Sequence, residues 1–222
     1  MKKIFIPFIV LCILTNGCVT LLPVALDGEE CVDQYYVEST NPDYVDPFVL
    51  TDIFTEEIRS TWGFEKNDCH SFTVTSEMKA KGSTGLEMHW SHEPSGCDWI
   101  GVGFSWNDWA PIDMSGIEND HALQFYIRPI KGRIGFIPIN AVFSDKEGHE
   151  SMWVTVSSKH YDGFGIDDKD WTVVTIPLND FQFEYKNVNT AKIDQLKLSF
   201  DGAADVYFDE LKIVKINKNK NS

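Results

Sequence analysis

The chain has 222 residues, of which 43% are hydrophobic and 13% aromatic, and its formal net charge is −15. This length accommodates one domain and a leader segment. The negative charge argues against nucleic-acid binding and against electrostatic docking on anionic lipid, because both need a basic surface, whereas neutral ligands, cations and basic partners remain open.

The N-terminal segment predicts export. Two lysines precede an apolar run at residues 4–14, which suits a signal peptide and is too short for a comfortable membrane span. The run ends in a sequence that resembles a bacterial lipobox before Cys18, although Thr15 stands where Leu is usual. We therefore expect a lipoprotein signal peptide at residues 1–17, lipidation of Cys18, and anchoring to the cell membrane or outer membrane. The alternative is ordinary secretion or periplasmic release after cleavage near Ala25.

The remaining chain divides into three predicted parts. Residues 18–47 carry Pro, Gly and acidic residues with little periodicity, which indicates a flexible tether. Residues 48–216 are predicted to form one β-sandwich domain, and residues 217–222 a disordered Lys/Asn tail.

The cysteines that remain after the leader and Cys18 are Cys31, Cys69 and Cys97. An exported protein can form disulfides. We expect a Cys69–Cys97 pair, with Cys31 left in the tether. No Cys/His spacing typical of a zinc site is present in the sequence.

Period-two alternation of apolar and polar residues predicts a series of strands. Within the segment 99–106, Gly101 and Gly103 take the face opposite the apolar residues, so another backbone or a ligand can approach closely there. Pro138 interrupts a later run and suits an edge strand or a bulge. The predicted strands cover residues 71–78, 86–90, 99–106, 122–129, 133–143, 152–156, 171–178, 196–200 and 206–214. Their number and spacing indicate an all-β fold, a jelly-roll β-sandwich of two antiparallel sheets.

The segment 193–214 is interpreted as a hairpin that closes the sandwich, with turn residues at 201–205. Its alternation slips by one residue at Asp209-Glu210, which predicts a β-bulge. Such a bulge would direct the Asp209 carboxylate out of the strand and toward a site.

The succession of segments resembles a bacterial carbohydrate-binding module of the galactose-binding-like jelly-roll type, closest to families eleven and thirty. The resemblance covers roughly residues 48–215 and rests on GSTGLEMHW, WIGVGFSW, DMSG, ALQFYIR, WTVVTIPL, IDQLKLSF and VYFDELKI. It implies a structural calcium ion held by Asp209 and Asp52, with backbone carbonyls near residues 81–83, because calcium takes six to eight oxygen ligands. The alternative is that Asp209 only hydrogen-bonds a neighbouring strand.

A sugar site needs exposed rings for the apolar faces of the pyranose and polar groups for its hydroxyls. The outward-facing side chains of adjacent strands are expected to supply both. For each tryptophan, packing in the core or at its rim is the competing interpretation. The predicted ligand contacts are Gln124, Tyr126, Arg128, Trp153, Thr155 and Lys197, with Trp106 and Trp109 at a loop edge and His160 and Tyr161 in the loop 157–170.

Catalytic motifs are absent from the sequence. There is no Glu-x-Asp-x-x-Glu array of the kind that sandwich hydrolases carry, and no Gly-x-Ser-x-Gly elbow. We therefore expect non-catalytic binding of a polysaccharide or oligosaccharide by a membrane-anchored module. The alternatives are a protein-binding or assembly sandwich that has lost its sugar site and, less favoured, a glycoside hydrolase.

Overall fold

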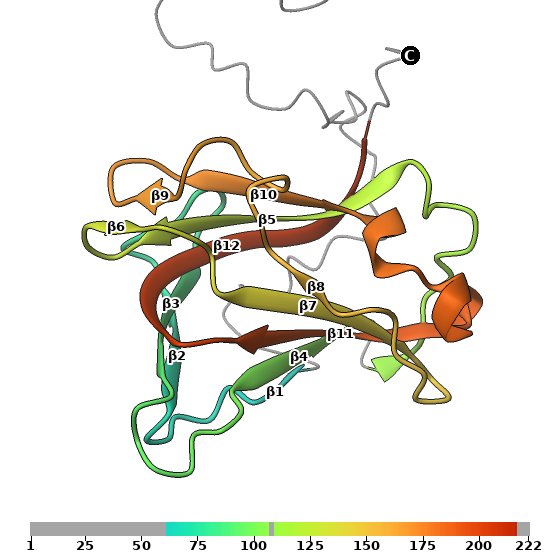
Figure 1. Ribbon diagram of the computed structural model, residues 1–222, viewed down its shortest axis with the longest axis horizontal. Helices are drawn as coiled ribbons and strands as arrows, with labels where there is room; N and C mark the ends of the chain where they lie inside the picture. The colour runs from blue at the N-terminus through green and yellow to red at the C-terminus, as the bar shows by residue number, and fades with distance from the viewer. Residues whose placement is uncertain (1–60, 107–108, 217–222) are drawn as a thin grey trace, which may run out of the picture. The chain divides into compact units, whose positions relative to one another are not determined.

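The structure, a computed structural model, describes residues 61–106 and 109–216 (Figure 1). The β4 sheet has the strand order β1-β4-β11-β7-β8, and the β5 sheet has the order β10-β5-β12-β3-β2. Both are antiparallel, which confirms the predicted all-β sandwich of two sheets. The strands of the β4 sheet are β1 (Thr61–Trp62), β4 (Gly101–Ser105), β11 (Ile193–Phe200), β7 (Ile139–Asp145) and β8 (Val154–Thr155). Those of the β5 sheet are β10 (Thr172–Pro177), β5 (His121–Pro129), β12 (Ala203–Lys215), β3 (Gly85–Ser91) and β2 (His70–Thr75).

The connections carry the smaller elements. A two-stranded ribbon pairs β6 (Arg133–Ile134) with β9 (Ile166–Asp167). Pro138 has no N–H to donate to a ladder, and the apolar run around it divides into β6 and β7 instead of forming the one edge or bulged strand that was expected. Three short 3₁₀ turns, η3 (Leu178–Phe181), η4 (Glu184–Lys186) and η5 (Thr190–Lys192), lie between β10 and β11.

The core lies between the two sheets, where the apolar positions of the alternating strands meet. Phe104 and Phe143 of the β4 sheet are at most 1% exposed, as are Phe125 and Phe208 of the β5 sheet. The rings of Phe125 and Phe208 stack with their centroids 4.8 Å apart. Burying each such side chain stabilises the fold by about 1.5–3 kcal/mol.

The predicted closing hairpin is wrong. β11 pairs with β4 and β7, whereas β12 pairs with β3 and β5, so the turn at Asp201-Gly202 carries the chain from one sheet to the other. Figure 1 shows β12 bending away from the end of β11. Alternation defines the buried side of each strand but not its partner, and a short turn fits a hairpin or a crossing between sheets.

The predicted bulge in β12 is confirmed. The register between β12 and β5 shifts between Asp209 and Lys212, and Glu210 has a φ of 55°. The extra residue returns Leu211 and Ile213 to the core.

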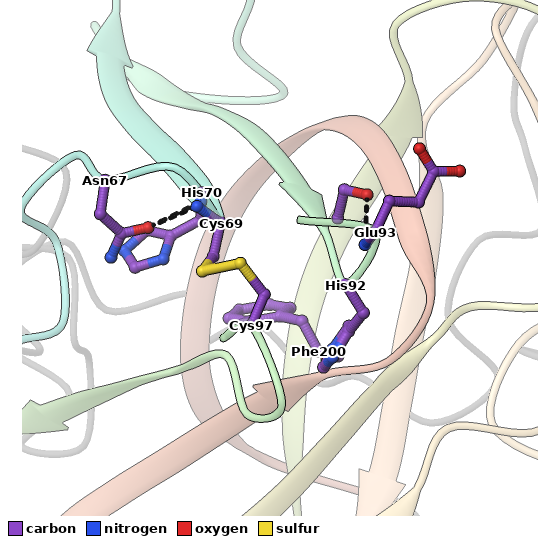
Figure 2. Close-up of a disulfide and its surroundings, with 8 residues drawn as sticks. Asn67, Cys69, His70, His92, Glu93, Cys97 and Phe200 are labelled. Atoms are coloured by element: carbon purple, nitrogen blue, oxygen red, sulfur yellow. Dashed lines mark hydrogen bonds between the residues drawn. A yellow bond between two sulfur atoms is a disulfide. The ribbon is translucent and has the colours of Figure 1, made fainter. Parts of the chain in front are cut away.

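The predicted disulfide is also confirmed: Cys69 and Cys97 are joined, with their Cα atoms 5.5 Å apart (Figure 2). It links the segment before β2 to the loop that leads into β4. Asn67 Oδ1 accepts hydrogen bonds from the backbone N–H groups of Cys69 and His70 and fixes the same segment.

Several predicted features lie outside the described residues: the signal peptide at 1–17, Cys18, the tether at 18–47, Asp52 and the tail at 217–222. Among residues 61–106 and 109–216, no helix has both the length and the apolar composition that a membrane crossing requires.

Candidate functional site

The structure separates the predicted ligand contacts onto two surfaces. Gln124 and Arg128 belong to β5, on the side of the β5 sheet that faces away from the core. Trp153, Thr155 and Lys197 belong to the outer face of the β4 sheet, because their strand neighbours Val154, Leu196 and Leu198 are buried in the core. Alternation identified the outward positions, but it could not assign the strands to sheets.

On the β5 sheet, the predicted exposure is wrong for Gln124 and Tyr126, whereas Arg128 is half-buried. Gln124 is only 1% exposed and donates from Nε2 to Thr175 Oγ1. Tyr126 is 8% exposed, and Lys81 Nζ lies 5.4 Å from its ring centre. Arg128 donates from Nε and Nη2 to the carbonyl of Asp168 over 2.9 and 2.5 Å. Gln124 thus contacts the neighbouring strand β10, and Tyr126 and Arg128 contact turns of the same chain.

On the β4 sheet, two glycines seat two indole rings. Val102 and Phe104 point into the core, so Gly101 and Gly103 lie on the outer face of β4. A Cβ atom at Gly103 would overlap with the ring of Trp62, and one at Gly101 would overlap with the ring of Trp99. Both rings therefore rest directly on the backbone of this strand.

Trp62 and Trp99 form an aromatic platform at the β1 edge of this sheet. Their ring centroids are 5.8 Å apart and their planes are 27° from parallel. Trp99 is 57% exposed, a large fraction for an indole that contacts another. An exposed ring face held on a strand can stack against an apolar face of a ligand.

Polar groups line the strands between the platform and the opposite edge. Asn140 of β7 donates to Asp201 Oδ2 over 2.8 Å, and Thr155 of β8 donates from Oγ1 to Asn140 Oδ1 over 2.6 Å. Lys197 of β11 forms a 2.7 Å ion pair with Glu150. Amide, hydroxyl and ammonium groups therefore share one side of the sheet.

Trp153 stands at the far edge of the same face and is 41% exposed. The β7–β8 register pairs Asn140 with Thr155 and Ala141 with Val154, and its continuation places Trp153 opposite Val142. Val142 is in register with Lys197, and Lys197 with Gly103, which is the seat of Trp62. From Gly103 to Trp153 this row crosses three strand intervals, about 14 Å at about 4.8 Å each, with an indole at each end.

The comparisons with known proteins bear on what such a face does. The sequence model of the family described as Carbohydrate binding domain 30 matches residues 51–215. The chain belongs to this family. Its function is non-catalytic carbohydrate binding, as the resemblance implied.

The first two of the following solved structures agree with the sandwich fold. A crystal structure of a family 30 carbohydrate-binding module is 23% identical, with a TM-score of 0.52, and the match covers 68% of this chain and 77% of that one. A β-1,2-glucanase from Parabacteroides distasonis is 13% identical with a TM-score of 0.52, and the match covers 76% of this chain and 25% of that enzyme. A family 11 module from Clostridium thermocellum in complex with a β-1,3-1,4-mixed-linked tetrasaccharide is 14% identical with a TM-score of 0.49, over 75% and 95% of the two chains. No curated protein sequence matches the chain.

Other predicted site residues of this family 30 domain lie apart from the β4 face. Trp106 follows the last residue of β4, but it is 4% exposed and stacks on Phe143, so the competing interpretation of core packing holds for it. Trp109 is 41% exposed, next to residues 107–108, which the structure does not describe. His160 and Tyr161 are 3% and 8% exposed.

Trp62 and Trp99 were not among the predicted contacts. The signal that could have found them is the pair Gly101 and Gly103 on one side of β4. A strand with only glycines at neighbouring positions on one side leaves room there for an aromatic ring. Nothing in the local sequence says that the rings filling this room come from residues 62 and 99.

Asp209 has a set of hydrogen-bond donors around it. Oδ2 accepts from the N–H groups of Ala80 and Lys81 over 2.7 and 3.1 Å, and Oδ1 accepts from that of Glu210 over 2.7 Å. Burial raises the pKa of Asp209 above its ordinary value, although the three N–H groups act in the opposite direction.

These contacts fit the alternative role for Asp209, a carboxylate that ties β12 to the turn after β2. Calcium needs oxygen ligands, and the three groups in contact with Asp209 are N–H donors. Within the described ranges, no three side chains of the His, Cys, Asp and Glu types gather as metal ligands. Asp52 lies outside those ranges, so calcium stays a prediction.

Proposed function

We propose that the outer face of the β4 sheet binds a neutral polysaccharide, with Trp62, Trp99 and Trp153 stacking on its sugar rings. The observation that carries this proposal is the pair of indoles seated on Gly103 and Gly101, one of them 57% exposed. Pyranose rings combine apolar C–H faces with a rim of hydroxyls, and indoles beside amide and hydroxyl groups complement both.

The polar side chains of the face determine how a saccharide chain is oriented. Asn140 and Thr155 can accept or donate hydrogen bonds to hydroxyls, and the Lys197–Glu150 pair offers a donor beside an acceptor. Because these groups are already bonded to one another, they are held in place before the ligand arrives. Such preorganisation lowers the entropy lost on binding.

The test compares the retention of alanine variants on a panel of neutral polysaccharides, such as cellulose, mixed-linkage glucan, xylan and starch. Trp99→Ala should weaken binding to the retained glycan by about tenfold or more, which corresponds to about 1.4 kcal/mol. Phe164→Ala is the matched control, because this ring is 91% exposed and lies in the loop before β9. Equal binding by wild type and Trp99→Ala would remove the platform from the site. Failure of the wild-type domain to bind any glycan would favour the protein-binding alternative.

The anchoring of the domain is a separate part of the proposal. A lipid on Cys18 would hold the module at a membrane, where it would keep polysaccharide near the cell. Cys18→Ser should move the protein from the membrane fraction to the soluble fraction. Unchanged fractionation would reject lipidation at this residue and favour another mode of export or attachment.

A structural calcium ion is proposed at Asp209 and Asp52. A chelator should then lower the Tm, and added calcium should restore it. An unchanged Tm would leave Asp209 with only its three N–H partners.

A further inference from the structure

A cavity of about 310 Å³ lies beyond the β8 edge of the β4 sheet, next to η3. The Met152 N–H donates to the Phe181 carbonyl over 2.8 Å and joins the strand segment to the turn. The residues that line the cavity include Trp153, Thr155, Lys159, Asn179, Asp180 and Gln182.

We propose that this cavity is a separate subsite that holds one pyranose unit at the end of the saccharide chain bound on the β4 face. The inference rests on the proposed function, because the chain must first lie across the sheet. The cavity adds contacts from η3 and from the segment after β8 to those that the sheet provides.

The cavity is lined by the apolar residues Met152, Trp153 and Val154 and by several polar groups. Trp153 offers a half-exposed indole. Asp180 Oδ2 accepts hydrogen bonds from Lys159 Nζ over 2.9 Å and from His160 Nε2 over 3.0 Å. In the described part of the chain both bonds use Oδ2, so Oδ1 can accept from a ligand hydroxyl. Asn179 donates from Nδ2 to Asn119 Oδ1 over 3.1 Å. With its amide oriented in this way, the Oδ1 atom of Asn179 is a further acceptor for a ligand hydroxyl.

His160 positions Asp180 and does not contact the ligand. It is 3% exposed, and its Nδ1 accepts the Ser157 N–H over 3.1 Å, so the ring proton lies on Nε2 and is donated to Asp180. Burial lowers the pKa of His160, which keeps the ring neutral. Burial acts to raise the pKa of Asp180, but the hydrogen bonds from Lys159 and His160 hold it below its ordinary value, so the carboxylate stays an acceptor.

The charge of the cavity suits a neutral ligand. Asp180 and Lys159 compensate each other, and the other groups at the cavity, the Asn179 and Gln182 amides and the Thr155 hydroxyl, are uncharged. A ligand that presents hydroxyls and an apolar ring face matches this lining, whereas a carboxylate or phosphate would meet the Asp180 anion. A pyranose is such a ligand.

The cavity adjoins the outer face of the β4 sheet through Trp153 and Thr155, which belong to both that face and the cavity lining. Three strand intervals separate β4, on which the platform lies, from β8 at the cavity edge, about 14 Å at about 4.8 Å per interval. A short oligosaccharide that occupies the platform cannot reach the cavity. The contribution of the cavity must therefore depend on chain length.

Titration calorimetry with oligosaccharides of the retained glycan, from disaccharide to hexasaccharide, tests this subsite. For the wild type, affinity should show a further increase at the oligosaccharide length that first reaches from the platform to the cavity. Trp153→Ala should remove that increment, with a loss of about tenfold for the longest chains and no change for the shortest. Asp180→Asn, which keeps the side-chain shape, should lose part of the same increment. Tyr185→Ala, at a 75% exposed ring on η4, is the control.

The outcomes separate the two proposals. Loss of affinity in Trp153→Ala that is equal at every length, or absent at every length, overturns the subsite while Trp99→Ala still reports on the platform. A wild-type domain that binds no oligosaccharide overturns the proposed function and the subsite together. Gln182→Ala, at an exposed position on the cavity rim, gives a second measurement if Asp180→Asn unfolds.

Discussion

At the scale of single residues, the site depends on two glycines, Gly101 and Gly103, which have no side chain and so leave room for a ring. The ring of Trp62 occupies the space that a Cβ atom at Gly103 would fill. The absence of this Cβ atom therefore lets the ring lie on the strand as part of the platform. A strand glycine ordinarily weakens a sheet, so its presence on the outer face of β4 is explained by the ring that covers it.

Gly103→Ala should therefore weaken glycan binding, because the new methyl group displaces the Trp62 indole from the strand. We expect the overlap to lower the free energy of unfolding by about 1–3 kcal/mol. Gly135→Ala is the matched control, since a Cβ there meets no atom within 4 Å and the backbone has no positive φ. Glycan affinity and Tm measured on both variants check the prediction, which fails if Gly103→Ala binds as wild type does.

Asp145, the last residue of β7, shows how a buried charge is stabilised in the β4 sheet. It is 2% exposed and accepts hydrogen bonds from the Asn189 N–H over 2.8 Å and from the N–H and Nδ1 of His149 over 2.9 and 3.0 Å. Burial alone would raise the pKa of Asp145, but these bonds lower it below 3.8. A carboxyl group whose pKa is lower in the folded state stabilises the fold above its unfolded pKa and loses that effect as the pH falls.

Asp145→Asn should thus lower the free energy of unfolding at pH 7 by about 1–3 kcal/mol, because N–H donors lose a charged acceptor. The difference from wild type should shrink as the pH falls below 3.8, the ordinary value for this group. Urea unfolding of both proteins at neutral and acidic pH measures it, with Asp162→Asn, an exposed position, as control. A difference that is independent of pH would assign the loss to packing.

At the scale of elements, the sequence predicted strands well and their neighbours poorly. Alternation located β3, β5, β10 and the bulge of β12, because each strand buries one side in the core. It could not show that β11 and β12 enter different sheets, since partner choice depends on contacts with strands far away in the sequence. The same limitation placed Gln124 and Trp153 on one surface, although the structure puts them on opposite sheets.

The Cys69–Cys97 disulfide connects the two segments that carry the platform. Trp62 precedes the segment that ends at Cys69, and Trp99 follows Cys97 in the loop before β4. The crosslink closes a sequence separation of 28 residues, for which chain entropy predicts about 3–4 kcal/mol of stabilisation. It therefore both stabilises the fold and restrains the two indoles relative to each other.

Replacement of both cysteines by serine should lower the free energy of unfolding by about 3–4 kcal/mol. Under conditions where the variant remains folded, its glycan affinity should also fall, because Trp62 and Trp99 then move more independently. Calorimetric titration of folded oxidised and variant protein measures this second effect. Equal affinities would limit the disulfide to stability.

At the scale of the whole molecule, charge selects among glycans. The whole chain carries a net charge of −15, which gives it an anionic field. On the proposed binding surface, Lys197 is compensated by Glu150 and Lys159 by Asp180, so these cations are not available to attract a polyanion. A polysaccharide that carries carboxylates would approach against the field, whereas a neutral one is unaffected by it.

Binding of a neutral glycan should consequently change by less than about twofold between about 0.1 M and about 1 M NaCl, a range in which the Debye length falls from about 10 Å to about 3 Å. Over the same range, an anionic polysaccharide such as polygalacturonate should go from no retention to weak retention, because salt screens the repulsion. Affinity electrophoresis at both salt concentrations makes the comparison. Strong retention of the anionic chain at low salt, lost as salt is added, would contradict the neutral-ligand proposal and would require a cationic surface on the β4 face.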